Sequence, residues 1–266
     1  MIPPVVDPAW LADHPGAVVA DARWYLDGRS GHDAYLAGHI PGAVFIDLDS
    51  SLTGPPGPAA GRHPLPDPDR FAAAMGRAGI GDGTTVIAYD DAGGTVAARL
   101  VWMLRSLGSD AALLDGGMAA WAGDLERTPS ARPPARFTAR PWPEAALAGI
   151  DDLAGAAVVL DARDPARFRG DHEPVDPRAG HIPGALNMPS RANLDGAGRF
   201  LPVAELRARF EAVGAGPGTI CYCGSGVTAC HNLLALEHAG LGPGRLYPGS
   251  WSQYSSDPDR PAETGP

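Results

Sequence analysis

The chain of 266 residues has no lysine, so all 21 of its basic side chains are arginine. This absence excludes a lysine Schiff base and phosphate binding by the lysine of a nucleotide-binding loop. Basic residues are also outnumbered, because 31 acidic residues give a formal net charge of −10. Phosphate binding needs a basic surface, so we expect no nucleic acid partner. Small anionic substrates are compatible with this charge, since they respond to the local field of a site.

Long apolar runs and a cysteine framework are missing as well. No apolar stretch reaches the roughly 18 residues of a membrane span, and Met1–Pro4 lacks the basic and then apolar pattern of a signal peptide. The chain has only three cysteines, all between positions 221 and 230, which makes a poor disulfide framework. We therefore expect a cytoplasmic protein, and the absence of a coiled-coil pattern favours a monomer.

The most informative feature that is present is an internal repeat. Three pairs of segments correspond in the same order along the chain: Asp21-Ala22-Arg23 and Asp161-Ala162-Arg163, Gly38–Ala43 and Gly180–Ala185, Thr85–Tyr89 and Gly218–Tyr222. Ordered matches of this kind indicate a duplicated domain.

Each copy alternates short β-rich runs with helical ones, which predicts an α/β fold with a parallel sheet flanked by helices in each half. The helical runs span residues 71–79, 97–108, 203–213 and 229–239. A Pro-rich stretch separates the copies and is typical of an extended linker. We therefore predict an N-terminal domain over 1–124, a linker over 125–143 and a C-terminal domain over 144–266.

The candidate chemistry lies in the stretch Cys221–Cys230. A β-rich run ends there, and a glycine-spaced turn leads into a helical run with Cys223 at its start. Such a turn directs backbone N–H groups inward, and the helix N-terminus favours a thiolate, so Cys223 is the predicted nucleophile. With the repeats aligned at an offset of 132, Asp91 stands opposite Cys223. The first domain is therefore predicted to be catalytically silent.

Other interpretations of these residues are weaker. Cys223 alone would also fit a small buried apolar residue. A zinc site from Cys221, Cys223, Cys230 and His231 has a ligand spacing that matches none of the usual pairs, so no metal is expected. His39 and His181 recur in both copies, and a catalytic histidine is needed only once, so both are interpreted as structural. The same holds for the repeated Asp-Ala-Arg segments.

Taken together, the motifs resemble the tandem rhodanese-type sulfurtransferases over essentially the full length. The supporting segments are the paired Gly-His-Ile-Pro-Gly-Ala and Asp-Ala-Arg motifs, Phe168-Arg169-Gly170, the Cys223–Thr228 loop and Gly249-Ser250-Trp251. This resemblance implies two rhodanese domains, with an active site at their interface in the C-terminal loop.

The loop Cys-Gly-Ser-Gly-Val-Thr is similar to that of mercaptopyruvate sulfurtransferases, whereas thiosulfate enzymes of the mitochondrial kind more often place two basic residues after the cysteine. The resemblance implies that Ser225, His63 and Asp49 relay protons. It also implies that Arg167 holds the substrate carboxylate. A second substrate arginine would fall on Asp176, which leaves Arg178 as the nearest candidate.

The mechanism that the resemblance implies is a double displacement. Cys223 takes a sulfane sulfur from 3-mercaptopyruvate, becomes a persulfide and passes the sulfur to a small thiol, thioredoxin or cyanide. Backbone N–H groups of the loop would stabilise the persulfide and bind substrate, and the loop residues concerned are Gly224, Gly226, Val227 and Thr228. No cofactor is expected. Thiosulfate as donor is the main alternative.

Two rivals come from other functional classes. A cysteine phosphatase on this fold needs the pattern Cys-x5-Arg, but the sixth residue after Cys223 is Ala229. A non-enzymatic sulfur-binding module would lack proton-relay residues, and the matches at His63 and Asp49 argue against it.

Overall fold

The computed structural model describes residues 1–266 and forms two compact units. The first unit consists of Met1–Thr53, Pro66–Trp142 and Leu194–Phe200, and the second of Gly54–Leu65, Pro143–Asn193 and Leu201–Pro266. Two short segments, 54–65 and 194–200, thus pack with the half of the chain to which they do not belong in sequence. The predicted division at 125–143 did not anticipate this exchange. Because of the exchange, His63 lies in the same unit as Cys223.

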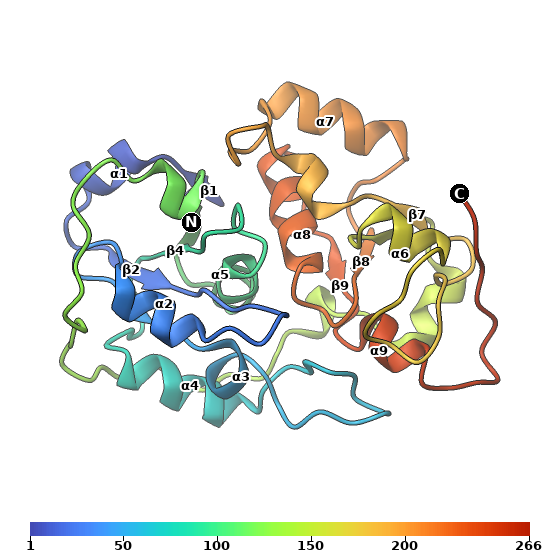
Figure 1. Ribbon diagram of the computed structural model, residues 1–266, viewed down its shortest axis with the longest axis horizontal. Coiled ribbons are helices and arrows are strands. Elements are labelled where there is room, and N and C mark those ends of the chain that lie inside the picture. Colours follow the sequence, from blue (N-terminus) through green and yellow to red (C-terminus); the bar gives the residue numbers. More distant parts are fainter. The chain divides into compact units, whose positions relative to one another are not determined.

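The first unit contains a parallel sheet of five strands in the order β1-β5-β4-β2-β3 (Figure 1). Its strands are β1 Val5–Val6, β2 Val18–Asp21, β3 Val44–Phe45, β4 Val86–Tyr89 and β5 Ala111–Leu114. Its helices are α1 Pro8–Asp13, α2 Gly31–Ala37, α3 Leu48–Ser51, α4 Pro68–Arg77, α5 Ala97–Ser106 and the 3-10 turn Gly117–Ala120. The apolar β4 is buried along its whole length, and α5 packs against β4 and β5.

The second unit repeats this plan with four parallel strands in the order β7-β6-β8-β9 (Figure 1). Its strands are β6 Val159–Asp161, β7 Leu186–Asn187, β8 Ile220–Tyr222 and β9 Arg245–Leu246. Its helices are α6 Pro165–Arg169, α7 Val203–Ala212, α8 Ala229–His238 and α9 Ser250–Tyr254, with 3-10 turns at Glu144–Ala146, Ile150–Gly155 and Ser190–Asn193. The predicted α/β class and its long helices are confirmed. Neither unit holds a helix with the length and apolar character needed to cross a membrane.

The repeated Asp-Ala-Arg segments have the same structural role in both units. The Arg23 guanidinium pairs with Asp21 and donates to the Gly38 carbonyl at 2.8 Å, and Arg163 does the same with Asp161 and Gly180 at 2.7 Å. These buried pairs tie β2 to the repeated segment Gly38–Ala43 and β6 to its counterpart Gly180–Ala185. The histidine of each repeated turn is buried and hydrogen-bonds a backbone carbonyl, which confirms its structural interpretation: His39 bonds Tyr35 and His181 bonds Phe168.

Candidate active site

Cys223 is the first residue after β8 and stands at the carboxyl end of a central strand, where parallel sheets commonly place their ligands. The Gly226 N–H donates to Cys223 Sγ at 3.1 Å, and Gly226 has φ +79°, a conformation that glycine adopts without strain. The ten-residue helix α8 begins at Ala229 without a side-chain cap. Its positive N-terminal end therefore remains available to stabilise negative charge on the loop.

The backbone on either side of the nucleophile is held by the start of α9. The Cys223 N–H donates to Ser250 Oγ at 3.2 Å, and the Cys223 carbonyl accepts the Trp251 N–H at 3.0 Å. Ser250 is the only non-glycine residue with positive φ, at +52°. Such strain persists where the surroundings fix it, and here it aims Oγ at the nucleophile's backbone. The Gly249-Ser250-Trp251 segment is one of the motifs that carry the family resemblance, but the sequence does not indicate that it positions the backbone of Cys223.

His63 and Ser225 are brought together as predicted from the resemblance. The His63 Nδ1 atom lies 2.7 Å from Ser225 Oγ, and both residues are only 6% exposed. The contact depends on Gly61, where an added Cβ would lie 2.6 Å from the Gly249 carbonyl oxygen. The hydroxyl–imidazole pair is two residues from the nucleophile and has the geometry of a proton relay.

Asp49 is the third residue predicted for this relay, and it belongs to the first unit. It lies in the short helix α3, where its Oδ2 accepts the indole N–H of Trp24 at 3.0 Å. Its role as the acid of a relay stays a prediction from the resemblance.

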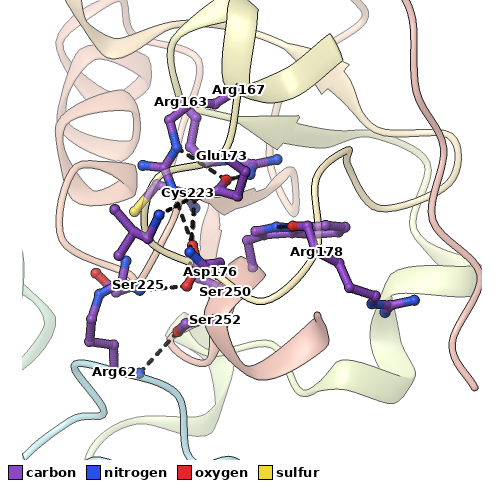
Figure 2. Close-up of polar contacts among 12 residues, drawn as sticks. Arg62, Arg163, Arg167, Glu173, Asp176, Arg178, Cys223, Ser225, Ser250 and Ser252 are labelled. Atoms are coloured by element: carbon purple, nitrogen blue, oxygen red, sulfur yellow. Dashed lines mark hydrogen bonds and ion pairs between the residues drawn. The ribbon is translucent and has the colours of Figure 1, made fainter. Parts of the chain in front are cut away.

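Charged side chains surround the loop on the α6 side (Figure 2). Arg167 donates to Glu173 at 2.6 Å and to Asp176 at 3.0 Å, and Asp176 also forms an ion pair with Arg62. Asp176, which replaces an expected arginine, is thus a binding partner of arginines. Sequence reasoning missed Arg62, although it stands directly before His63, which the resemblance marks as a relay residue.

Arg178 is not brought to this cluster. Its guanidinium donates to three backbone carbonyls, those of Tyr254, Ser255 and Arg260, and in Figure 2 it extends away from Cys223. The expectation that Arg178 supplies a second substrate arginine is therefore not supported by its position. Proximity in sequence to Asp176 suggested the role, but the side chain instead fixes the C-terminal segment.

The other two cysteines differ from Cys223 in their surroundings. Burial raises the pKa of the Cys221 thiol, and the Cys230 thiol contacts the Gly226 carbonyl at 3.4 Å. None of the three cysteines forms a disulfide. The structure gathers no group of three or more His, Cys, Asp or Glu side chains suited to a metal ion. Cys223 is therefore the cysteine placed for nucleophilic chemistry.

The corresponding loop of the first unit corrects the predicted alignment of the repeats. Tyr89 ends β4 and pairs in register with Asp21, just as Tyr222 ends β8 and pairs with Asp161. The residue after Tyr89 is Asp90, so Asp90 and not Asp91 stands opposite Cys223. The matching Tyr residues in the sequence already carried this signal.

Asp90 occupies its loop as a built-in anion. Its two carboxylate oxygens accept four backbone N–H bonds of 2.7 to 2.9 Å, from Ala92, Gly94, Val96 and Ala97. Burial raises the pKa of Asp90, and these four donors oppose that shift. The fold therefore builds an N–H-lined cradle at this point of the repeat, and in the first unit a carboxylate fills it.

Glu173 gives the cluster a testable pH dependence. Burial disfavours its ionised form, but hydrogen bonds from Arg167 and from the backbone N–H groups of Asp176 and Val175 outweigh this effect and lower the pKa of Glu173. A lowered folded-state pKa contributes stability above the unfolded pKa of about 4.3, and this stability is lost as the pH falls through the folded value.

Glu173→Gln is therefore expected to destabilise the protein by about 3 kcal/mol at pH 7, because Arg163 and Arg167 lose a buried partner. The difference from wild type should shrink below about pH 4. Thermal melting at several pH values measures it. Asp171→Asn is the matched control, since Asp171 pairs with Arg169 at the surface. A stability difference between wild type and Glu173→Gln that stays constant with pH would contradict a stabilising role of the ionised Glu173 carboxylate.

Both halves of the chain are similar to known proteins. A family model described as a rhodanese-like domain matches residues 7–124 and again 143–257. A probable 3-mercaptopyruvate sulfurtransferase of Pseudomonas aeruginosa is 45% identical, over 94% of this chain and 93% of that protein. A putative thiosulfate sulfurtransferase, SseB of Mycobacterium tuberculosis, is 41% identical, over 93% and 90%. The solved structure of SseA, a 3-mercaptopyruvate sulfotransferase of Escherichia coli, superposes with a TM-score of 0.81 at 35% identity, covering 94% of this chain and 100% of that one.

Proposed function

The chain belongs to the rhodanese family and is a sulfurtransferase, and we propose that it moves sulfur from 3-mercaptopyruvate to a thiol, thioredoxin or cyanide through a persulfide on Cys223. The observation that carries the choice of donor is the hydrogen bond between His63 and Ser225 at 2.7 Å. A proton relay beside the nucleophile suits a donor whose leaving group must gain a proton.

The first half-reaction forms an S–S bond and breaks a C–S bond. The Cys223 thiolate attacks the donor sulfur, and the C–S electron pair leaves with the carbon skeleton as the enolate of pyruvate. The Ser225–His63 pair passes the proton of the donor thiol to the enolate carbon, which yields pyruvate and leaves the persulfide of Cys223 as an anion. Arg167 is proposed to bind the donor carboxylate, since a planar guanidinium matches carboxylate geometry.

In the second half-reaction the acceptor attacks the outer sulfur of the persulfide, and the Cys223 thiolate is regenerated. The Gly226 N–H, which already donates to Sγ at 3.1 Å, supports stabilisation of the sulfur anion in both states. We propose the same role for the backbone of Gly224, Val227 and Thr228.

We place this reaction in the cytoplasm, in a monomer that acts without a nucleic acid or a membrane. Three cysteines that form no disulfide and a formal net charge of −10 support this setting. We propose that Asp49 is the acid that assists His63.

Thiosulfate is the second candidate donor, because a relative of 41% identity carries that donor in its name. With thiosulfate, the thiolate attacks the outer sulfur and sulfite leaves with the S–S electron pair, so no proton is required. The two donors thus make different demands on the Ser225–His63 pair.

Exposure of the purified protein to each donor, followed by intact-mass measurement, tests the proposal. We expect the mass of one sulfur atom to be added to Cys223, and kcat/KM with cyanide as acceptor to be at least about tenfold higher for 3-mercaptopyruvate than for thiosulfate. The reverse preference would establish the thiosulfate alternative. Absence of a persulfide with both donors would overturn the enzymatic proposal in favour of a sulfur-binding module.

A further inference from the structure

Arg62 has a backbone that is fixed close to the nucleophile. Its N–H donates to Ser252 Oγ at 2.9 Å, and the preceding Gly61 passes so close to Gly249 that no side chain fits there. Because the backbone is held in this way, the long side chain is directed toward Asp176. Arg62 thus enters the site from the same segment that supplies His63.

Asp176 separates two guanidinium groups. Its Oδ1 binds Arg62 Nη1 and its Oδ2 binds Arg167 Nη2, so one carboxylate holds an arginine on each side. The Asp176 side chain is 2% exposed, whereas those of Arg62 and Arg167 are 26% and 17% exposed. The Asp176 carboxylate is therefore buried, whereas the two guanidinium groups are more accessible to solvent.

The guanidinium groups also converge on one point beside the nucleophile. The position that a Cβ would occupy on Gly224 is 3.1 Å from Arg62 Nη2 and 3.6 Å from Arg167 Nη1. Gly224 directly follows Cys223, so both groups reach the residue next to the reacting sulfur. Furthermore, the Nε atom of Arg62 is buried without a hydrogen-bond partner. A buried donor of this kind is costly unless an acceptor is supplied.

We propose that Arg62 is a donor-binding residue that forms, with Arg167, a two-arginine clamp for the anionic end of the sulfur donor, and that it sets the ratio of activity between singly and doubly charged donors. Asp176 is a positioning residue that fixes the spacing of the clamp. The inference rests on the proposed function, because it concerns the donor of that same site.

The clamp explains how a loop without basic residues after its cysteine accommodates an anionic donor. The positions after Cys223 are occupied by Gly224 and Ser225, yet Arg62 brings a cation to Gly224 from a distant part of the sequence. Thiosulfate carries two negative charges next to the sulfur that is attacked, whereas mercaptopyruvate carries one on its carboxylate. Loss of a cation should therefore weaken the binding of thiosulfate more strongly than that of 3-mercaptopyruvate.

Steady-state kinetics of Arg62→Gln with both donors test the clamp. We expect kcat/KM to fall about 100-fold for thiosulfate and about tenfold for 3-mercaptopyruvate, in the range of a lost charge-assisted hydrogen bond. With mercaptopyruvate the loss should appear mainly in KM. Arg62→Lys keeps the charge but loses the planar fork, so it should recover part of the thiosulfate activity. Arg169→Gln is the matched control, since Arg169 pairs with Asp171 at the surface.

The outcomes separate the clamp from the proposed function. If the wild-type protein forms no persulfide, both the clamp and the proposed function are overturned. If wild type turns over and Arg62→Gln loses equal factors with the two donors, or none, the clamp is overturned while the proposed function stands. Thermal melting identifies a folding defect in Arg62→Gln. In that case Arg62→Met decides, because it removes the charge but keeps most of the apolar stem: equal losses with the two donors, or none, in a folded methionine variant overturn the clamp.

Discussion

Cys223→Ser is expected to abolish sulfur transfer from both donors and to leave the fold intact. A serine hydroxyl is not ionised at neutral pH and forms no persulfide, so kcat/KM should fall by at least about 10³-fold. The side chain is small, and its Sγ accepts a hydrogen bond from the backbone N–H of Gly226, which a serine hydroxyl can also accept, so the melting temperature should stay within about 2 °C of wild type. Turnover with cyanide and intact-mass measurement provide the two readouts.

Cys221→Ala is the matched control for this prediction. Cys221 is buried in β8, and burial raises the pKa of its thiol, so it is not expected to react. This variant should retain transfer if it is folded. Retained turnover in Cys223→Ser, or its loss in a stable Cys221→Ala protein, would show that sulfur is carried elsewhere.

His63→Ala and Ser225→Ala are expected to reduce kcat/KM for 3-mercaptopyruvate about 100-fold, the usual scale of a lost proton-transfer group. Thiosulfate activity should fall much less, because sulfite leaves without a proton. The two single variants and the double variant should lose similar factors, since the hydroxyl and the imidazole act as one unit. kcat/KM values for both donors across these variants measure the effect.

His172→Ala is the control for removal of an imidazole, because His172 is an exposed histidine in the same unit. His172→Ala should leave kcat/KM unchanged for both donors. Equal losses with the two donors in His63→Ala and Ser225→Ala would count against a relay and would indicate that the pair only positions the loop.

The parts of the fold that the sequence predicted are those written in local patterns. The apolar run predicts helix α8, and the glycine-spaced turn before that helix points to Cys223. The duplicated domain was found because its motifs recur in order. These features depend on residues close together in sequence, where periodicity and turn chemistry are visible.

The parts that the sequence did not predict depend on contacts between distant residues. Arg62 and Asp176 are 114 positions apart, and no periodic pattern marks the segment Gly54–Leu65 that carries Arg62 into the second unit. Its place near Asp176 in the sequence makes Arg178 a candidate for substrate binding, but three backbone carbonyls bind its guanidinium instead. Side-chain direction is set by tertiary packing, which neighbouring letters do not reveal.

The carboxylate of Asp90 has a consequence for counting reactive groups. The first cradle is occupied by a residue that thiol reagents do not alkylate and that peroxide does not convert to a sulfenic acid. Of the two copies of the loop, only that of Cys223 carries a thiol at this position, so only it offers a group that oxidants and electrophiles can modify. Active-site titration with an alkylating reagent should therefore count molecules one for one, and oxidative inactivation should follow a single event per chain.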